Sequence, residues 1–227
     1  MRRLGVITGF SREADCLDAF PADLRPLVRC SGASSGRALT QARDLIASGC
    51  DALVSFGIAG GLRPDLEPGT VIIADSVIAL DGQHIGTSKP WRDGLLAACG
   101  GTGMMVAAVA GSDRIVGEVA EKRALADGTG AAAVDMESHA VAAVAAEAGV
   151  PVLVVRAVAD AATRRLPDWV AGCVAADGSR RWGAVATAVL RNPGDVGVLV
   201  ALAGDSAKAL KALRGVAGRA GPLFGLR

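Results

Sequence analysis

The stretch from Ala131 to Asp160 constrains the fold more than any other part of the sequence. It reads AAAVDMESHAVAAVAAEAGVPVLVVRAVAD, which is a short apolar run, an acidic turn, a small-residue helix and an apolar strand ending on an aspartate. Gly149 and Pro151 end the helix, because neither residue favours its continuation. The unit places two carboxylates, Glu137 and Asp160, at the edges of buried elements, where a charge needs a partner or a purpose. We therefore expect catalytic or binding residues in this unit.

Apolar runs alternate with helical segments along the rest of the chain. The pattern predicts strands at residues 4–8 and within DALVSF, TVIIAD and MMVAAVAG. It predicts helices over SREADCLDAF, from SGASSGRAL to Ser48, over WRDGLLAAC, from Ser112 to Ala126, and roughly over Trp169–Arg191 and Val196–Gly215. Apolar runs with few polar interruptions are typical of strands covered on both faces. The sequence thus predicts one α/β domain over residues 1–227, with three layers and a central mixed sheet.

Several connecting segments carry expectations of their own. The GIAGGL segment, residues 57–62, is predicted as a glycine turn after DALVSF, at the kind of strand end where α/β sheets bind ligands. Residues 76–90 are predicted as an irregular loop, in which His84 is expected to be solvated. The SGASSGRAL segment lacks both common phosphate-loop motifs and is predicted to be a flexible connection. The basic C-terminal tail is predicted to be a frayed helix.

The first helix offers a structural explanation for one acidic residue. Ser11 is a plausible N-cap, and Glu13 would lie in the first turn, where the helix dipole favours a carboxylate. Asp113 is expected to cap a later helix in the same way. Capping alone therefore accounts for Glu13 as long as no other context is considered.

Composition excludes several classes of protein. A net charge of +1 gives no broad attraction for nucleic acid or an anionic membrane. The five cysteines show no CxxC pair and no metal-ligand spacing, so we expect reduced thiols, no metal and a cytoplasmic location. The first residues are too short an apolar run for a signal peptide, and no stretch approaches the roughly 20 apolar residues of a membrane span.

Three segments together resemble a known superfamily. They are GVITGFSREA, SFGIAGGLRPDLEPGTVIIAD and AVDMESHAVAAVAAEAGVPVLVVRAVAD, and they cover most of residues 4–165 in the expected order. In combination they resemble the nucleoside phosphorylase/nucleosidase superfamily, which includes purine nucleoside and uridine phosphorylases and the methylthioadenosine/S-adenosylhomocysteine nucleosidases. The resemblance implies a central mixed sheet with distorted barrel character, surrounded by helices.

The resemblance also implies catalytic roles. Glu137 corresponds to the glutamate that holds the ribose 2′- and 3′-hydroxyls, and Met136 to a methionine that packs against the sugar. Asp160 corresponds to the aspartate that donates a proton to the purine N7. Glu13 falls on the carboxylate that orients the attacking water in the nucleosidases.

Further positions are implied to surround the substrate. Ile115 and Val116 occupy the segment that borders the adenine, and Phe10 stands where an apolar residue lines the same pocket. Gly57 and Ile58 belong to the glycine segment at the carboxyl end of a strand, and are expected to bind substrate. The family needs no cofactor, although phosphate is the co-substrate of its phosphorylases.

These roles suit the chemistry of an N-glycosidic bond. Its cleavage passes through an oxocarbenium-like state, in which the sugar becomes positive and the base leaves as an anion. Protonation of the base by Asp160 would give a general-acid contribution of about 10²–10⁴ in rate. Asp160 must then be protonated near neutral pH, whereas Glu137 is expected to stay ionised and to stabilise the cation.

The sequence also departs from the superfamily pattern. Ser55 stands where uridine-type phosphorylases carry an arginine for phosphate, and Ile58 stands where the nucleosidases often have Ser or Thr. Ala159 replaces the serine that usually precedes the catalytic aspartate. Without the arginine, phosphate loses a bidentate partner, which favours water as the nucleophile. Three other arginines could substitute for it: Arg12, Arg63 and Arg156.

The C-terminal third carries a narrower resemblance. LPDWVAGCVAADG and RNPGDVGVLVALAGDSAKALKAL are similar to the branch associated with hopanoid biosynthesis, which implies removal of adenine from adenosylhopane. The alternatives are a methylthioadenosine/S-adenosylhomocysteine nucleosidase and a nucleoside-binding protein without catalysis. Relatives are dimers or larger, so a homodimer or larger homo-oligomer is expected, in which a neighbouring chain can complete the site.

Overall fold

The protein alternates strands and helices, as its apolar runs predict. The computed structural model describes residues 3–226 except 22, 102, 168, 171–174, 176–177, 180–186 and 188–189. Its strands are β1 (Leu4–Thr8), β2 (Leu27–Cys30), β3 (Ala52–Gly61), β4 (Val71–Ile78), β5 (His84–Gly86), β6 (Met104–Gly111), β7 (Ala133–Asp135) and β8 (Val152–Asp160). Its helices are α1 (Ser11–Ala14), α2 (Ser35–Ala47), α3 (Lys89–Cys99), α4 (Val119–Thr129), α5 (Ser138–Ala148) and α7 (Val196–Ala220), with 3-10 turns η1 (Asp15–Leu17) and η3 (Pro193–Asp195).

The strands form one mixed sheet that closes on itself. Along the sheet the order is β2-β1-β3-β7-β6-β4-β5, and β8 pairs with both β3 and β4. A ring of five strands, β3, β7, β6, β4 and β8, results, while β1, β2 and β5 extend from it. The pairs of β3 with β8 and of β1 with β3 are parallel, whereas β4 is antiparallel to β8. The predicted mixed, partly barrel-like sheet is confirmed.

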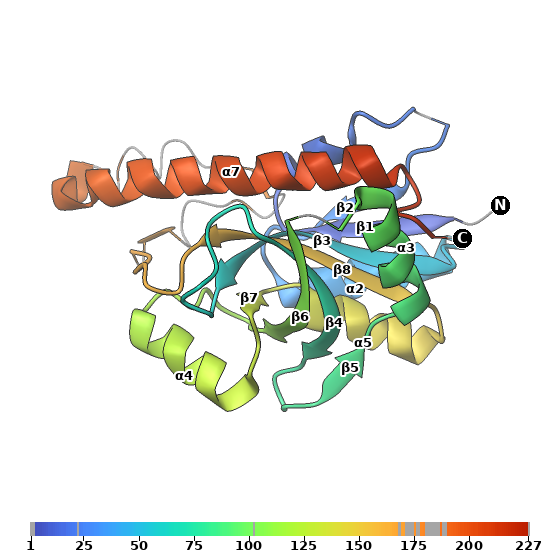
Figure 1. The fold of residues 1–227 in the computed structure, drawn as a ribbon, viewed down its shortest axis with the longest axis horizontal. Coiled ribbons are helices and arrows are strands. Elements are labelled where there is room, and N and C mark those ends of the chain that lie inside the picture. The colour runs from blue at the N-terminus through green and yellow to red at the C-terminus, as the bar shows by residue number, and fades with distance from the viewer. Residues whose placement is uncertain are drawn as a thin grey trace.

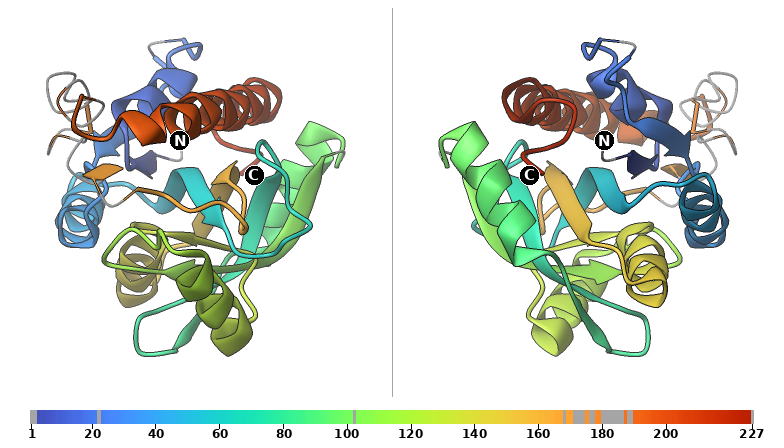
Figure 2. Two further views of the ribbon diagram at one scale, coloured as in Figure 1. Left: turned by 90° about the vertical axis from the view of Figure 1, so that its left-hand side faces the viewer. Right: turned by 90° about the vertical axis from the view of Figure 1, so that its right-hand side faces the viewer.

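Helices cover the sheet on two sides. In Figure 1, α7 runs across one side of the sheet and α5 lies on the other; the end-on views of Figure 2 show the same layers. On the first side, α7 and α3 contribute buried apolar residues, among them Leu210, Leu213, Val216, Trp91 and Leu95. On the second side, α2 and α5 contribute a smaller-residue set, among them Ala38, Ala42, Leu45, Val141 and Ala145. The predicted three-layer α/β domain is therefore confirmed.

The glycine segment is a strand, which corrects its prediction as a turn. β3 continues through Gly61 and pairs with β8 from Leu53 to Gly60. The register shifts between Ala59 and Gly60, so that Gly60 faces Asp160. Space is tightest at Gly57, where a Cβ would lie 2.7 Å from the Glu13 carboxyl carbon, whereas a Cβ on Gly60 would be in ordinary contact with the Asp160 carboxylate at 3.4 Å. In this strand, glycine marks close packing and a bulge rather than a chain reversal.

Two other predictions, one of a loop and one of a helix, were wrong in part. Residues 76–90 are not irregular throughout, because β4 extends to Ile78 and pairs with the short β5 in a hairpin. The helix predicted from Ser112 begins only at Val119. The Ser112 hydroxyl instead donates to the Arg114 carbonyl at 2.7 Å and accepts from the Arg114 N–H at 3.3 Å, so a local turn replaces the helix there.

The first helix is also capped differently from the expectation. The N-cap of α1 is Phe10, and Ser11 is its first helical residue. The Glu13 side chain reaches back to the Phe10 N–H, as in a capping box. The predicted helix Trp169–Arg191 lies mainly outside the described residues.

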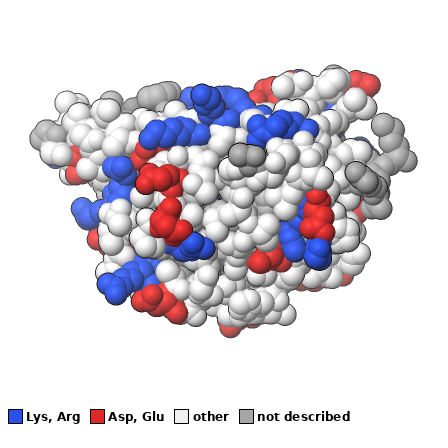
Figure 3. All heavy atoms as spheres, in the orientation of Figure 1, with Lys and Arg blue, Asp and Glu red and all other residues white. Residues whose placement is uncertain are grey.

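The surface shows no dominant charge on the face drawn in Figure 3. Basic side chains gather over α7, and acidic and basic side chains are mixed below it. None of the helices in the described part of the chain combines the length and apolarity needed to cross a bilayer. Cys16, Cys30, Cys50 and Cys99 are free thiols, and Cys173 lies outside the described residues.

The C-terminal tail is packed against the core, so its prediction as a frayed helix was wrong. α7 continues to Ala220, and the chain then turns so that Phe224 is fully buried. The Phe224 ring lies edge-on to Phe56 at a centroid distance of 5.5 Å, and its carbonyl accepts a hydrogen bond from the Trp91 indole at 3.0 Å. Apolar residues near the end of the basic stretch thus complete one side of the core.

Truncation of the buried ring should be costly. We expect Phe224→Ala to lower the free energy of unfolding by about 3–5 kcal/mol, because it leaves a cavity among aromatic neighbours. Leu223→Ala is the matched control, since Leu223 is 38% exposed and should change stability by less than about 1 kcal/mol. Urea unfolding followed by circular dichroism measures both. Equal effects would mean that the tail does not anchor to the core.

Candidate functional site

Four ionisable side chains meet where several strands and helices begin or end. Glu13 comes from α1, directly after β1. Asp135 is the last residue of β7, Glu137 directly precedes α5, and Arg156 lies within β8. All four are buried. The structure therefore brings Glu13 and Glu137 into one cluster, although 124 positions separate them in the sequence.

Arg156 holds this cluster together. Its side chain is fully buried, and its Nε lies 2.5 Å from Asp135 Oδ2. Its Nη2 donates to Ser55 Oγ at 2.6 Å and lies 3.5 Å from Glu137 Oε2. Asp135 in turn accepts the backbone N–H groups of Glu137 and Ser138, at 2.9 and 2.8 Å, and so fixes the start of α5. One guanidinium thus positions both acidic residues of the β7–α5 connection.

Glu13 is bound by backbone groups from two elements. Its Oε2 accepts N–H groups of Gly9 and Phe10 at 2.7 and 2.8 Å, and its Oε1 accepts the N–H of Ile58 at 2.8 Å. Burial raises the pKa of Glu13, while Arg156 and these N–H groups oppose the rise. A carboxylate has about four acceptor positions, so three bonds leave one on Oε1 for another partner.

Glu137 has few strong partners for a buried carboxyl group. Its Oε1 accepts the Ser31 hydroxyl at 3.2 Å, and its contact with Arg156 is long. Burial raises its pKa to about 8, Arg156 opposes the rise, and Asp135 and Glu13 add to it. The raised pKa favours the protonated form of Glu137 in the free protein, whereas the resemblance implies an ionised one. Burial is the main cause of the raised pKa, and the excess of three carboxyl groups over one guanidinium adds to it.

One nitrogen of Arg156 makes no hydrogen bond within the described part of the chain. This atom, Nη1, is buried, whereas buried polar groups are normally paired. A Cβ built on Gly57 would collide with Nη1 and would lie 2.7 Å from the Glu13 carboxyl carbon. Nη1 is thus close to Glu13, and the absence of a side chain at Gly57 leaves the room that both groups occupy.

Asp160 lies farther along β8, after the bulge, and is also buried. Its carboxylate forms an ion pair with Lys122 of α4, whose side chain is fully buried. Burial raises the pKa of the Asp160 carboxyl, and the Lys122 ammonium opposes the rise. Lys122 was not among the predicted site residues. Within EVAEKRALADGT, nothing in the local sequence distinguishes it from the exposed charges beside it.

Seven residues were predicted to bind the substrate. Gly57 and Glu137 are buried, and the other five are half-buried, which suits residues that line an open site: Phe10, Ile58, Ile115, Val116 and Met136. Ile58 also binds Glu13 through its backbone, as described above. Val116 lines a hollow of about 450 Å³ between the β4–β5 turn and α4, so its place beside the adenine stays a prediction.

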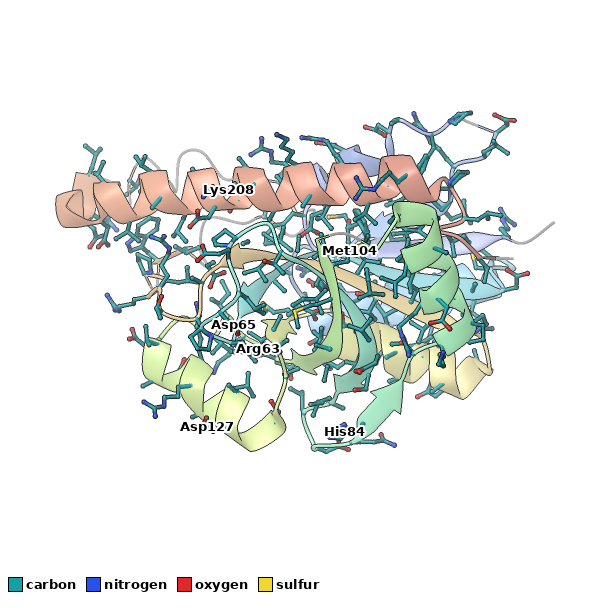
Figure 4. All side chains as sticks on the ribbon, in the orientation of Figure 1. Arg63, Asp65, His84, Met104, Asp127 and Lys208 are labelled. Atoms are coloured by element: carbon teal, nitrogen blue, oxygen red, sulfur yellow. The ribbon has the colours of Figure 1, made fainter. Side chains whose placement is uncertain are left out.

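The arginines proposed as phosphate partners can now be placed. Arg63 lies at the surface beside Asp65 and pairs with it at 2.6 Å (Figure 4). Arg12 is exposed, and only Arg156 of the three belongs to the buried cluster. His84 is exposed on the β5 hairpin, on the opposite side of the molecule from Lys208 of α7 (Figure 4), as expected for a solvated residue.

A sequence model of the phosphorylase superfamily matches residues 27–191. The chain belongs to the phosphorylase superfamily. The match covers well over half of the sequence and includes Glu137, Arg156 and Asp160. It confirms the predicted relationship to nucleoside phosphorylases and nucleosidases. No sequence among the curated proteins matches this member of the superfamily.

Solved structures of similar fold are nucleosidases and a hydrolase. The Helicobacter pylori 5′-methylthioadenosine/S-adenosylhomocysteine nucleosidase is 19% identical with a TM-score of 0.69, over 96% of this chain and 98% of that one. The Streptococcus pyogenes S-adenosylhomocysteine nucleosidase is 21% identical with a TM-score of 0.65, over 71% and 84%. The futalosine hydrolase of Helicobacter pylori is 19% identical with a TM-score of 0.63, over 70% and 88%. These likenesses establish the shared fold.

A methyl group at Gly57 should disturb the cluster. We expect Gly57→Ala to lower the free energy of unfolding by about 1–3 kcal/mol, because the new Cβ would force Arg156 or Glu13 to move. Gly36→Ala is the control, since nothing lies within 4 Å of its Cβ position, and it should be neutral or stabilising by up to about 1 kcal/mol. Thermal and urea unfolding would reveal a tolerant site if the two variants behaved alike.

The raised pKa of Glu137 predicts a pH dependence of stability. Between its usual pKa of 4.5 and about 8, the folded state keeps the Glu137 proton and the unfolded state loses it. Stability should therefore fall as pH rises through this range, by up to about 1.4 kcal/mol per pH unit. Glu137→Gln should flatten the decline in urea-unfolding free energy between pH 5 and 8. Glu147→Gln, with an exposed carboxylate on the same helix, should not.

Proposed function

We propose that this protein hydrolyses the N-glycosidic bond of a purine nucleoside. The observation that carries the proposal is the buried Nη1 of Arg156, which is without a hydrogen-bond partner among the described residues and adjoins Glu13. An orphaned donor beside a carboxylate with one remaining acceptor position suits a water molecule, which can accept from the first and donate to the second. Such a water would be held and oriented for attack.

The other buried acids fit the remaining tasks. Glu137 accepts one hydroxyl bond within the described protein, so its oxygens can accept the ribose 2′- and 3′-hydroxyls. Substrate binding would place the developing positive charge of the sugar beside it and favour its ionised form. Asp160 has a raised pKa, as a proton donor to the purine N7 requires. Half-buried Phe10 and Met136 would pack against the nucleoside.

The charges of the cluster favour water over phosphate as nucleophile. Arg156 is surrounded by Asp135, Glu137 and Glu13. Burial lowers the pKa of its guanidinium, but these three carboxyl groups raise it, and the net shift is upward. A phosphate dianion would add two negative charges to a buried group of three carboxyls and one guanidinium. Because like charges in a low-dielectric site repel strongly, its binding would be unfavourable. A neutral water molecule adds no charge, so its binding is not opposed by this repulsion.

The substrate is proposed to be an adenine nucleoside. The resemblance of the C-terminal third to the hopanoid-associated branch supports adenosylhopane, although LPDWVAGCVAADG lies mostly outside the described residues. The similar solved nucleosidases are described as acting on 5′-methylthioadenosine and S-adenosylhomocysteine, which makes these the second candidates. Both sets share an adenosyl group and differ on the 5′ side.

Base release from three nucleosides tests the activity. We expect adenine release from an adenosylhopane analogue, methylthioadenosine or adenosine, detected by chromatography, with the same rate in the presence and absence of phosphate. A requirement for phosphate would make the protein a phosphorylase. Binding without release would make it a nucleoside-binding protein, and the nucleoside with the highest kcat/KM would identify the 5′ substituent.

Amide substitutions test the assigned roles. Asp160→Asn should reduce kcat by at least about 10²-fold, because an amide cannot donate the acidic proton. Glu13→Gln should cause a similar loss if water is the nucleophile, and a much smaller one if phosphate is. Asp127→Asn, at an exposed site on α4, is the control and should retain full activity. Near-normal turnover by Asp160→Asn would refute its role as acid.

A further inference from the structure

Lys122 is the most unusual charged residue outside the cluster around Arg156. Its side chain is fully buried although it lies on α4, a helix with exposed charges on either side. The ammonium donates to Asp160 Oδ2, to the Ala161 carbonyl at 3.1 Å and to the Arg164 carbonyl at 3.0 Å. All three of its N–H donors are used. A lysine is rarely buried so completely unless it is paired.

The loop after β8 has anchors other than Lys122. Arg164 pairs with Asp205 of α7 at 3.0 Å, and Arg165 pairs with Glu118 at 2.6 Å. The Leu166 N–H donates to the Gly117 carbonyl at 3.0 Å. The loop is therefore attached to both α4 and α7 without the lysine. Among the described residues, Lys122 is the only one that forms a hydrogen bond or ion pair with the Asp160 side chain.

The charges around Asp160 give this contact a chemical consequence. Lys122 faces it from α4, Arg164 from the following loop and Asp205 from α7. Burial raises the pKa of the Asp160 carboxyl, Lys122 opposes the rise most strongly, Arg164 also opposes it, and Asp205 adds to it. Without the lysine, the carboxyl would hold its proton more tightly, because its ionised form would be buried beside little positive charge.

We propose that Lys122 is a positioning residue for Asp160: its ammonium holds the carboxyl group at the end of β8 and stabilises the carboxylate left when the proton moves to the purine. This inference rests on the proposed function. In that step the Asp160 O–H bond breaks and an N7–H bond forms. The C1′–N9 electron pair passes to the base, while water bonds to C1′ and gives up its proton to the Glu13 carboxylate. Negative charge then appears on Asp160, where Lys122 already lies.

Substitution of Lys122 tests this proposal through pH profiles. In Lys122→Met the alkaline limb of kcat/KM for adenine release should move to higher pH by about one unit or more. Its kcat should fall by about 10²-fold with a smaller change in KM, because transition-state stabilisation is lost. Lys122→Gln removes the charge but keeps a donor and should shift the limb in the same direction. Lys122→Arg should keep it near the wild-type pH.

A second readout does not depend on turnover. Carbon-13 NMR of the carboxyl groups, with the Asp160 signal assigned from its loss in Asp160→Asn, should show a higher pKa for Asp160 in Lys122→Met and in Lys122→Gln. Lys89→Met is the matched control, because this lysine pairs with an aspartate at the surface with 74% of its side chain exposed. It should leave both the pH profile and the Asp160 signal unchanged.

The outcomes separate this inference from the proposed function. An active wild type with the same pH profile and Asp160 titration in folded Lys122→Met or Lys122→Gln would overturn the role of Lys122 and leave the hydrolase intact. A wild type that releases no base would refute the proposed function. In that case an unchanged Asp160 titration would overturn the Lys122 inference as well, and a shifted one would support its control of the Asp160 proton.

Discussion

The fully buried guanidinium of Arg156 is the charge on which the rest of the site depends. Three carboxyl groups surround it, and none of them could remain buried without a positive partner except by taking up a proton. Because these groups come from α1, the β7–α5 connection and β8, folding of the sheet and assembly of the site are one event. Loss of the guanidinium would leave three uncompensated acids at two junctions of the fold, β1–α1 and β7–α5.

Buried acids are compensated in two different ways at the candidate site. Around Arg156, burial and an excess of carboxyl groups over cations raise the pKa of Glu137, and the cluster is suited to bind neutral hydroxyls and water. At the end of β8, Asp160 has its own cation and can lose a proton at lower cost. A nucleoside bridging the two regions would meet a hydroxyl-binding end and a proton-donating end. The two ends differ because Asp160 has a cation of its own, whereas the three acids around Arg156 share one.

Local sequence predicted the elements that carry the site better than it predicted their surroundings. The apolar strand ending on Asp160 and the helix that Gly149 ends are both present, because a continuous apolar run and a glycine stop are strong signals. An arginine inside that apolar strand also indicates a buried acidic partner. The glycines of β3 were wrongly predicted to form a turn, because glycine occurs both in turns and in tightly packed strands. Burial of Lys122 and Phe224 depends on contacts with distant segments, which no local pattern contains.

The double pairing of β8 has a consequence for how such a protein can diversify. At Arg156 the strand is hydrogen-bonded to β3 on one side and to β4 on the other, so it has no free edge there. Local opening of this strand would require rupture of the closed ring, and amide hydrogen exchange near Arg156 would approach the limit set by global unfolding. Phe10 and Met136 lie instead in connections between elements. If the protein acts as proposed, substrate preference can drift through these two residues while the buried acids stay fixed.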